Sequence, residues 1–539
     1  MIRLSEKIVA YLFLGLLLLT LGLSSSPYPC EAARSAEKGS AYFPGKGDTW
    51  EKRTPDELGM DSRLLQEAVD YAMANEWRGP KDLKEAITQA FGREPYGTII
   101  GPTKSRGGAA GLVLKNGYIV AEWGNTKRVD MTFSVTKSYL STMAGLALDQ
   151  GLIHDVHDPV KDYVKDGKFD SEHNSKITWH HLLQQTSDWS GILWEKPDWA
   201  DRPPRDAKWD DLRNRELKEP GTHYKYNDVR VNLLAYSLLQ IWLRPLPVLL
   251  REMIMDPIDA SPTWRWHGYE NSWVDIDGLK MQSVSGGGHW GGGMFISTRD
   301  LARFGLLFLR KGKWDGKQLI SEKWIDMLRI PSSANPIYGY MWWLNTGKRP
   351  IPSAPESVYY ALGFGGNCIA VDNEHDLVVV VRWAGSTKTL NGIMMRIIAS
   401  LEVNTPSPAQ EKKKKDAQTK YADFAGYYRF VLEGEEMLIK FYVEDGVLCG
   451  IGEYRLGELK PVKGNDLKFK VETPYGEKWS FEFIKDDKGK IVKCKFSDED
   501  FAEMGSVMGI KIIKDAKKKK MNTNHVHSSV TFHDTLFLN

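Results

Sequence analysis

A serine and a lysine three positions apart are the residues of this sequence best placed to do chemistry. They are Ser134 and Lys137, within the stretch Phe133–Ser138 (FSVTKS). On a helix this spacing puts both side chains on one face. A serine hydroxyl is a weak nucleophile until a nearby base accepts its proton, and a lysine in a crowded site can have its pKa lowered enough to do so. The pair therefore predicts nucleophilic catalysis, with the N–H groups of the first helical turn stabilising developing negative charge.

The spacing by itself has low specificity. Ser35 and Lys38 share it, in a stretch just after the N-terminal apolar segment where it has no chemical meaning, and Ser134 could simply cap the helix. A second motif narrows the interpretation, because Pro220–Asp228 (PGTHYKYND) leads into an apolar helical pattern. Its Tyr226 could serve as a base or proton relay beside a Ser–Lys pair, although core packing is the usual role of a tyrosine.

Other catalytic chemistries lack the residues that they need. Three histidine pairs have no glutamate partner at zinc-protease spacing and fit exposed or hydrogen-bonding roles better; they are His154 with His157, His180 with His181, and His525 with His527. The sequence contains no Gly-x-Ser-x-Gly pentapeptide. The glycine run Gly286–Gly293 lacks the Lys-Ser/Thr ending of a phosphate-binding loop. No metal or organic cofactor is therefore expected.

Five stretches, in order along the chain, resemble the serine β-lactamase and penicillin-binding-protein superfamily, in its β-lactamase-related esterase and amidase branch. The resemblance spans roughly residues 50 to 403 and rests on Phe133–Ser138, Thr178–Ser187, Pro220–Asp228, Gly291–Arg310 and Ala361–Val381. It implies that an acyl-enzyme forms on Ser134, that Lys137 activates this serine, and that Tyr226 is the tyrosine of the family's Tyr-x-Asn motif.

Two positions depart from the family's pattern. Asp228 stands where the motif has an asparagine; a literal Tyr-x-Asn occurs at Tyr269–Asn271 but lacks the Pro-Gly-Thr lead-in, so Tyr226 is preferred. Ala361–Gly363 (ALG) occupies the place of the family's Lys-Thr-Gly or His-x-Gly strand motif. A cation in that motif would bind the carboxylate of β-lactams and of peptidoglycan termini. Its loss favours esters or amides without such a carboxylate.

The resemblance also implies substrate contacts. Phe364 follows Gly363, and its backbone N–H, paired with that of Ser134, would form an oxyanion hole. Asp228 and Gly363 are expected beside the substrate. Tryptophans in the loops between the motifs either wall an acyl pocket, with Trp194 chosen as the substrate contact, or pack the loops onto the sheet; they are Trp189, Trp194, Trp199 and Trp290.

The elements that must position these residues are predicted to form an α+β domain over residues 51–403. Helical spacing runs from Leu64 to Ala72, resumes after Ser134 and returns over Gly392–Leu401. An Asn116-Gly117 turn between apolar runs predicts a hairpin, and Leu377–Val381 indicates a buried strand. Strands at both ends with helices between them predict one sheet assembled from distant parts of the chain. The resemblance implies a β-lactamase-like antiparallel sheet flanked by helices, with an all-helical subdomain.

The outer segments differ in composition. Residues 1–32 have a basic start, 16 uncharged apolar residues and a small-residue exit, which are typical of a secretory signal peptide; an uncleaved membrane anchor is second choice, and a lipoprotein linked through Cys30 is less favoured. Residues 33–50 and the Lys-rich 404–418 are predicted linkers, residues 419–513 a small all-β, barrel-like domain, and residues 514–539 a disordered Lys-rich tail. Cys449 and Cys494 could pair in an oxidising compartment or remain buried free thiols.

Composition limits the class of partner. The 539 residues carry 72 Lys plus Arg and 70 Asp plus Glu, and a net charge of +2 argues against a nucleic-acid-binding protein. Four cysteines exclude a disulfide-stabilised scaffold. The sequence therefore predicts a secreted or periplasmic serine hydrolase acting on a small ester or amide. The alternatives are a β-lactamase or peptidoglycan peptidase, with Lys225 or Arg382 binding the carboxylate, and a catalytically silent penicillin-binding-like receptor.

Overall fold

The computed structural model describes residues 41–47, 49–402, 421–432, 435–444, 447–452, 455–473, 477–498 and 506–512. The predicted signal peptide (1–32), the Lys-rich linker (404–418) and the tail (514–539) lie outside these ranges, as do residues 33–40 of the first linker. Within the described ranges no single helix is long and apolar enough to cross a membrane. Two consecutive helices, Asp228–Trp242 and Leu246–Met255, meet those criteria as a pair, with a bend of 78° between them.

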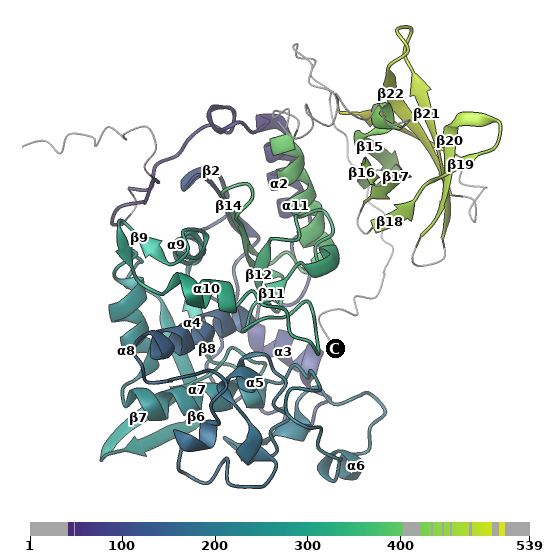
Figure 1. Ribbon diagram of the computed structural model, residues 1–539. Helices are drawn as coiled ribbons and strands as arrows, with labels where there is room; N and C mark the ends of the chain where they lie inside the picture. Colours follow the sequence, from purple (N-terminus) through teal and green to yellow (C-terminus); the bar gives the residue numbers. More distant parts are fainter. Residues whose placement is uncertain are drawn as a thin grey trace, which may run out of the picture. The chain divides into compact units, whose positions relative to one another are not determined.

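The main sheet of residues 50–402 has six antiparallel strands (Figure 1). Its order is β11-β12-β13-β14-β1-β2. The register of β1 against β14 runs from Ala110↔Arg382 to Lys115↔Leu377, so the first strand pairs with the last. This confirms the prediction of one sheet built from distant parts of the chain. The strands are β1 (Ala110–Lys115), β2 (Tyr118–Trp123), β11 (Trp343–Leu344), β12 (Tyr359–Gly363), β13 (Asn367–Asp372) and β14 (Leu377–Arg382).

The turn between β1 and β2 is the predicted Asn-Gly hairpin. Asn116 has a φ of 55° and Gly117 a φ of 87°. Positive φ at both central residues defines the turn type that suits the right-handed twist of paired strands, and asparagine and glycine tolerate it best.

Helices cover both faces of this sheet. On one face α2 (Ser62–Ala74) packs beside α11 (Thr387–Glu402), and their apolar side chains share a core with Val379 and Val381 of β14. On the other face lies α9 (Thr298–Leu309), where Gly305 fits so closely that a Cβ there would stand 2.7 Å from Val378 Cγ1. Alternate valines of β14 thus serve opposite faces, which explains why this strand is apolar throughout.

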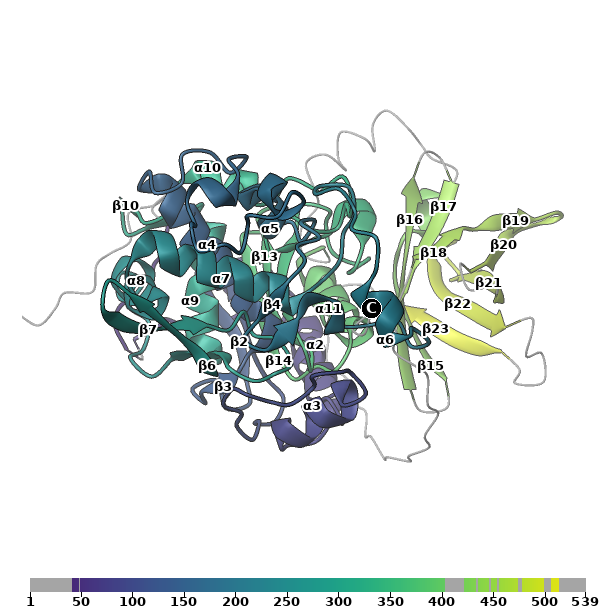
Figure 2. The same ribbon diagram turned by 90° about the horizontal axis from the view of Figure 1, so that it is seen from below.

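A helical part and a second sheet complete this domain (Figure 2). The second sheet has the strand order β3-β8-β6-β7. Its strands are β3 (Asp130–Met131), β6 (Arg265–Ile276), β7 (Leu279–Val284) and β8 (Gly293–Ile296).

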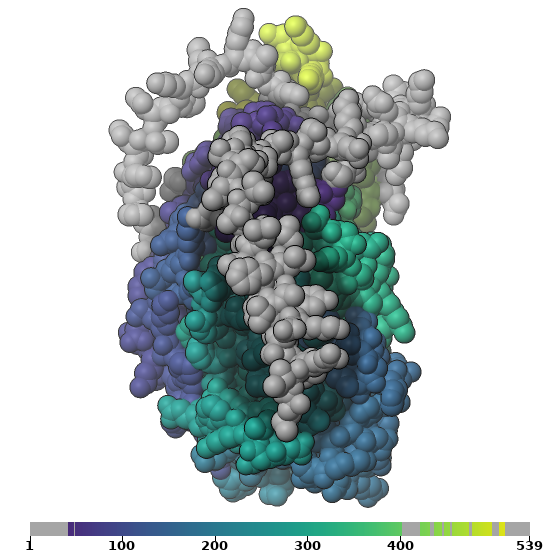
Figure 3. Space-filling model, turned by 90° about the vertical axis from the view of Figure 1, so that its left-hand side faces the viewer, coloured from purple at the N-terminus to yellow at the C-terminus, as the bar shows by residue number. Residues whose placement is uncertain are grey.

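The remaining α-helices are α3 (Leu83–Phe91), α4 (Thr136–Asp149), α5 (Trp179–Leu183), α6 (Trp209–Arg213), α7 (Asp228–Trp242), α8 (Leu246–Leu250) and α10 (Glu322–Met327), and α8 continues into a π-helical turn (Arg251–Met255). Two short hairpins pair β4 (Ile192–Leu193) with β5 (Lys196–Pro197) and β9 (Lys313–Trp314) with β10 (Lys317–Gln318). In the surface view, early (purple and blue) and later (teal and green) residues lie next to one another (Figure 3).

The C-terminal part is all-β, as predicted. Nine antiparallel strands follow the order β18-β17-β16-β15-β23-β22-β21-β20-β19, and contacts between β18 and β20 bring the two ends of this sheet close together. Cys449 and Cys494 are both free and buried here, which fits the thiol alternative. The strands are β15 (Gly426–Leu432), β16 (Glu435–Glu444), β17 (Val447–Ile451), β18 (Arg455–Glu458), β19 (Lys460–Val462), β20 (Asn465–Glu472), β21 (Lys478–Lys485), β22 (Ile491–Asp498) and β23 (Val507–Lys511).

Candidate active site

Ser134 lies in a short 3₁₀ turn, Phe133–Val135, that runs directly into α4. Lys137 follows on α4, and its Nζ donates a hydrogen bond to Ser134 Oγ at 2.9 Å. The residue before the serine, Phe133, has a φ of 49°. This left-handed conformation costs a bulky residue about 1–2 kcal/mol, and such strain gathers at functional sites. The structure therefore brings the predicted nucleophile and its predicted partner into direct contact, next to a strained residue.

The glycine run Gly286–Gly293 packs against this turn. A Cβ on Gly287 would stand 2.1 Å from the carbonyl oxygen of Phe133 and 2.6 Å from Thr136 Oγ1. The N–H of Met294 donates a hydrogen bond to that same Thr136 oxygen at 3.0 Å. The backbone of the run thus touches the backbone of the nucleophile turn, so Gly287 leaves room for a close approach that any side chain would block.

Lys137 is 1 % exposed, and a carboxylate lies against it. Its Nζ is 2.7 Å from Asp228 Oδ1, and it also donates to the Gly286 carbonyl at 3.3 Å. Burial is the largest influence on the pKa of Lys137 and lowers it, while the Asp228 carboxylate opposes this effect. A lowered pKa brings a lysine closer to serving as a base near neutral pH.

Tyr226 stands directly before α7 and completes the cluster. Its side chain lines the same pocket as Ser134, and its ring centroid lies 5.0 Å from Lys137 Nζ. The following Asn227 caps α7, because its side chain accepts the N–H of Arg230 at 3.1 Å. Burial raises the pKa of Tyr226, and nearby Asp228 adds to this effect. The resting side chain is therefore the neutral phenol, which can pass a proton between its neighbours.

Tyr269, the tyrosine of the alternative Tyr-x-Asn, lies in β6 with different partners. Its buried hydroxyl accepts hydrogen bonds from Asn232 Nδ2 and Ser285 Oγ, both at 3.1 Å. Both of those partners are distinct from Ser134 and Lys137. The geometry therefore favours Tyr226 over Tyr269.

A largely apolar pocket lies over the nucleophile. It encloses about 710 Å³ of empty space, open solvent included. Aromatic and aliphatic side chains dominate its lining, and Arg202 brings the single formal charge. The lining residues are Phe91, Ser134, Arg202, Tyr226, Ile337, Trp343, Pro350, Leu362, Gly363, Phe364 and Thr387. Two of the predicted substrate contacts, Gly363 and Phe364, are among them.

The end of β12 touches the backbone of the nucleophile turn. A Cβ on Gly363 would stand 2.3 Å from the carbonyl oxygen of Thr132 and 3.3 Å from the backbone nitrogen of Ser134. Phe364 is the next residue, and its ring lies edge-on to that of Phe133, with centroids 5.2 Å apart. This close approach is what an oxyanion hole formed by the N–H groups of Ser134 and Phe364 requires. The oxyanion role itself stays a prediction.

Two other predicted substrate contacts do not line this pocket. Asp228 is 1 % exposed, and its carboxylate is taken up by buried cations rather than being open to a ligand. Trp194 lies in the turn between β4 and β5, where its ring packs edge-on against Tyr236 with centroids 5.8 Å apart. Its φ of 51° is the left-handed conformation of a tight turn residue. The sequence alone could not reveal either environment.

The tryptophans of the intervening loops pack the structure instead of walling the pocket. Trp189 and Trp290 are buried, and Trp199 contacts Tyr96 edge-on. The tryptophan that does line the pocket is Trp343 of β11, whose ring stacks on Tyr226 at 5.8 Å. Sequence reasoning missed it because it lies outside every motif.

Arg202 is the main ionic residue that the sequence analysis missed. One guanidinium nitrogen, Nη1, lies 2.8 Å from Asp201 Oδ1, and the other, Nη2, lies 2.8 Å from Asp228 Oδ2. Its Cζ is 5.0 Å from the centre of the Tyr226 ring. The sequence did point to a cation near Asp228, because an aspartate in place of the motif's asparagine creates a buried negative charge that needs cations.

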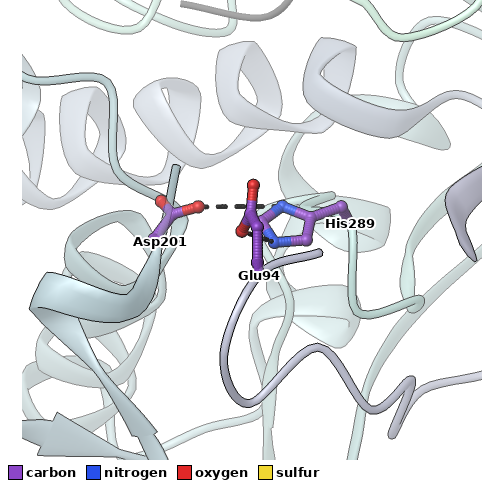
Figure 4. A group of neighbouring side chains, drawn as sticks. All are labelled: Glu94, Asp201 and His289. Carbon is purple, nitrogen blue, oxygen red and sulfur yellow. Dashed lines mark ion pairs between the residues drawn. The ribbon is translucent and has the colours of Figure 1, made fainter. Parts of the chain in front are cut away.

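Behind this arginine lies a second unpredicted group, made of Glu94, Asp201 and His289 (Figure 4). The imidazole Nε2 of His289 is 3.0 Å from Glu94 Oε2. Its Nδ1 is 3.2 Å from Asp228 Oδ2 and 3.7 Å from Asp201 Oδ1. These residues come from separate loops, so no spacing along the sequence could have revealed the group.

The residues proposed as carboxylate anchors for the rival activities lie elsewhere. Arg382 is 2 % exposed and donates through Nη2 to the carbonyl of Met131 at 3.0 Å. Neither it nor Lys225 lines the pocket. The described histidine pairs have other partners as well: His180 Nδ1 is 2.6 Å from the Tyr340 hydroxyl, and His181 belongs to the capping box of α5.

A Ser–Lys–Tyr cluster with a buried lysine, next to the end of strand β12 of an antiparallel sheet and beside a helical part, defines a class of serine-hydrolase-like proteins. Comparison with known families agrees with this class. A family model described as Beta-lactamase matches residues 85–394, more than half of the chain, and the protein belongs to that family. The resemblance inferred from the sequence motifs is thereby confirmed.

Individual relatives are more distant. An uncharacterized protein of Alkalihalophilus pseudofirmus is 26% identical over 321 residues, which cover 51% of this chain and 82% of the relative. Among solved structures, a putative beta-lactamase from Bacteroides dorei is 15% identical, with a TM-score of 0.42 over 54% of this chain and 93% of that one. A putative 6-aminohexanoate-dimer hydrolase from Bacillus anthracis is 16% identical, with a TM-score of 0.40 over 66% and 97% of the two chains.

Proposed function

We propose that this protein is a secreted serine hydrolase that cleaves neutral carboxylic esters or amides through an acyl-enzyme on Ser134. The observation that carries the proposal is the 2.9 Å hydrogen bond from Lys137 Nζ to Ser134 Oγ, at the floor of an open pocket. Tyr226 lines the same pocket as this serine, and its ring centroid lies 5.0 Å from Lys137 Nζ. Such a nucleophile, with a base in contact and a second group beside it, has the arrangement required for covalent catalysis.

The reaction follows from these contacts. Ser134 Oγ bonds to the substrate carbonyl carbon while its proton passes to Lys137, directly or through Tyr226. The carbonyl electron pair moves onto oxygen, where the N–H groups of Ser134 and Phe364 stabilise the charge. Collapse of this intermediate breaks the bond to the leaving alcohol or amine, which takes the proton. Water then repeats the sequence on the acyl-enzyme, releases the carboxylic acid and regenerates Ser134.

The preference for neutral substrates rests on the charges around the pocket. Arg202 is the charged residue of the lining, and Asp201 and Asp228 neutralise it. Ala361 is 1 % exposed and brings no cation to the strand beside the nucleophile. A substrate carboxylate would therefore enter an apolar pocket without a free counter-ion, which is unfavourable. Aromatic rings of Phe91, Trp343 and Phe364 suit an apolar acyl group instead.

The test combines labelling with turnover. A fluorophosphonate should label wild-type protein, and Ser134→Ala should remove the label and lower kcat for p-nitrophenyl acetate by at least ~10³-fold. Ser141→Ala is the matched control, because this serine lies on the same helix and its buried hydroxyl has no hydrogen-bond partner among the described residues. Faster turnover of nitrocefin than of simple esters would favour the β-lactamase alternative, and a protein that is never labelled would favour the silent receptor.

Secretion is proposed from the composition of residues 1–32. Mass spectrometry of the N-terminus of the protein recovered from its native host tests it. A mature chain that starts near residue 33 is expected, whereas a chain that retains the apolar segment would support a membrane anchor.

A further inference from the structure

The charges behind the Ser–Lys pair form one buried network. Asp228 is its centre: Oδ1 faces Lys137, while Oδ2 faces both Arg202 and His289. Asp201 joins through Arg202, and Glu94 joins through His289. The six side chains come from α4, α7, the glycine run and two loops, and the carboxylates and the imidazole at the back of the network are almost completely buried.

The geometry of Glu94, Asp201 and His289 would admit a metal ion, because one ligand atom of each lies within 4.8 Å of the others. The charges of the surrounding side chains favour a proton on His289 instead of a metal ion. While Lys137 is in its protonated, resting form, three carboxylates face two cations, Lys137 and Arg202, so one further positive charge makes the network neutral. Burial raises the pKa of Asp201, but the neighbouring Arg202 opposes this effect. A divalent ion beside a neutral imidazole would leave an excess positive charge buried next to Arg202, which is costly.

The two nitrogens of the imidazole point to the same conclusion. They face different carboxylates, Nε2 toward Glu94 at 3.0 Å and Nδ1 toward Asp228 at 3.2 Å. A neutral imidazole has one N–H donor and one lone pair, whereas the protonated ring has two donors. A neutral ring would therefore aim a lone pair at one buried carboxylate. A protonated ring carries an N–H on each nitrogen: Nδ1 lies in hydrogen-bond geometry to Asp228, and Nε2 lies within ion-pair distance of Glu94.

We propose that His289 is a positioning residue that holds a proton between Glu94 and Asp228 and thereby sets how strongly Asp228 binds Lys137. This inference rests on the proposed function. Neighbouring rings fix the imidazole in place, since Phe91 stacks on it with centroids 4.4 Å apart and Trp290 lies at the same centroid distance. Gly288 allows the loop to approach, because a Cβ there would stand 2.7 Å from the Asp228 carboxyl carbon.

The effect on catalysis passes through Asp228. While His289 is charged, Asp228 shares its negative charge among three cations, so it stabilises the ammonium form of Lys137 less. Loss of the proton from His289 leaves Asp228 more available to Lys137, which then gives up its own proton less readily and is a poorer base for Ser134. Because His289 does not line the pocket, the change should fall on kcat and leave KM nearly constant.

The charged groups that face the ring come from three segments of the chain. Glu94 approaches from the loop after α3, Asp201 and Arg202 from the loop before α6, and Asp228 from the start of α7. Burial lowers the pKa of His289, but its hydrogen bonds to Asp228 and Glu94 outweigh this and raise the pKa above the ordinary value of 6.5. Arg202 also lowers this pKa, and Asp201 raises it.

The first experiment measures kcat and KM for p-nitrophenyl acetate from about pH 5 to about pH 9, the range in which a histidine titrates. Wild type should lose kcat on the alkaline side, above pH ~6.5. His289→Gln, which cannot be charged, should lack this decline and have a kcat at least ~10-fold lower at neutral pH, as one unit of pKa change at Lys137 requires. His173→Gln is the control, since this histidine contacts the Asp188 carbonyl outside the network.

The second experiment needs no variant and guards against a His289→Gln protein that fails to fold. NMR of wild-type protein with ¹⁵N-labelled histidine should show His289 protonated on both nitrogens at neutral pH. A single protonated nitrogen overturns the inference, as does an unchanged pH profile in folded His289→Gln. Stoichiometric zinc by elemental analysis, with activity lost to a chelator, would assign a metal to the site instead and also overturn it.

These outcomes are separable from failure of the proposed function. If a fluorophosphonate does not label Ser134, the proposed function fails. If labelling occurs at the same rate at every pH in both wild type and His289→Gln, the hydrolase assignment stands and the role of His289 falls.

Discussion

At the scale of single residues, an aspartate in place of an asparagine changes what the catalytic lysine must balance. An asparagine amide would leave Lys137 without a counter-ion, whereas Asp228 holds it at 2.7 Å. Burial raises the pKa of an isolated carboxyl, but Arg202, Lys137 and His289 together hold the pKa of Asp228 well below its usual range. Asp228 is therefore an anion at neutral pH, and three cations surround it.

Substitution of Tyr226 distinguishes a role in proton transfer from a role in packing. Tyr226→Phe should lower kcat by ~10²–10⁴-fold, the usual weight of a proton-transferring group, while leaving the pocket walls in place. Tyr269→Phe is the matched control: it loses hydrogen bonds with Asn232 and Ser285, so it should cost about 1–2 kcal/mol of stability but little activity per folded molecule. Ester turnover and urea unfolding of both variants provide the measurement. Equal activity losses in the two would remove Tyr226 from the proposed mechanism.

A substitution in the pocket wall tests the preference for substrates without a carboxylate. Thr387 lines the pocket and is half-buried. Thr387→Lys should strengthen binding of ester substrates that carry a carboxylate by about 1.5–3 kcal/mol, the worth of a charge-assisted hydrogen bond, and lower their KM accordingly. Thr387→Gln adds similar length without charge and should leave KM for such substrates unchanged. If wild type already prefers carboxylate-bearing esters to neutral ones, the argument from the missing strand cation is wrong.

At the scale of elements, the glycine run and the start of α4 form one unit. The loop backbone touches Phe133, and Phe133 precedes the nucleophile, so the loop sets the position of Ser134 from outside the pocket lining. This arrangement explains why the run resembles a phosphate-binding loop in composition but not in sequence. Its glycines serve backbone contact and positive φ rather than ligand binding.

Two glycines with the same φ separate the effect of close backbone contact from the effect of positive φ. Gly287 and Gly278 both have a φ of 80°, but a Cβ on Gly287 would stand 2.1 Å from Phe133 oxygen, whereas a Cβ on Gly278 meets nothing within 4 Å. Gly278→Ala should cost about 1 kcal/mol, from backbone strain alone. Gly287→Ala should cost more and should also lower kcat, because Phe133 must move. Urea unfolding and ester turnover provide the measurement; equal stability costs with unchanged activity in both variants would contradict this account.

The elements were largely predictable, and the contacts between them were not. Local signals are enough for the Asn116-Gly117 hairpin, the helix after Ser134 and the strand Leu377–Val381, because each depends on turn chemistry or apolar period within a few residues. Trp194 and Trp343 show the limit. Both are tryptophans in short hairpins or strands, and which of them reaches the pocket depends on how distant segments pack. The same holds for His289, whose partners lie far away in the sequence.

At the scale of the whole molecule, the buried network makes stability depend on pH in two opposite ways. The pKa of Asp228 is lowered in the folded state, so its contribution is present above its ordinary value of 3.8 and is lost as pH falls through the folded value. The pKa of His289 is raised, so its contribution is fully present below 6.5 and is lost as pH rises through the folded value. Together they favour maximal stability between about pH 4 and about pH 6.5.

The loss of stability on the alkaline side can be assigned to His289 by a substitution. Lys137 titrates in the opposite sense, because its pKa is lowered by burial, so the useful quantity is the difference between wild type and His289→Gln. That difference in unfolding free energy should be largest below pH ~6.5 and shrink as pH rises, by about 1.4 kcal/mol for each unit by which folding raises the histidine pKa. Urea unfolding of both proteins at a series of pH values measures it, with His173→Gln as the control. A difference that stays constant with pH would mean that His289 carries no proton in the folded protein and that the network is balanced in another way.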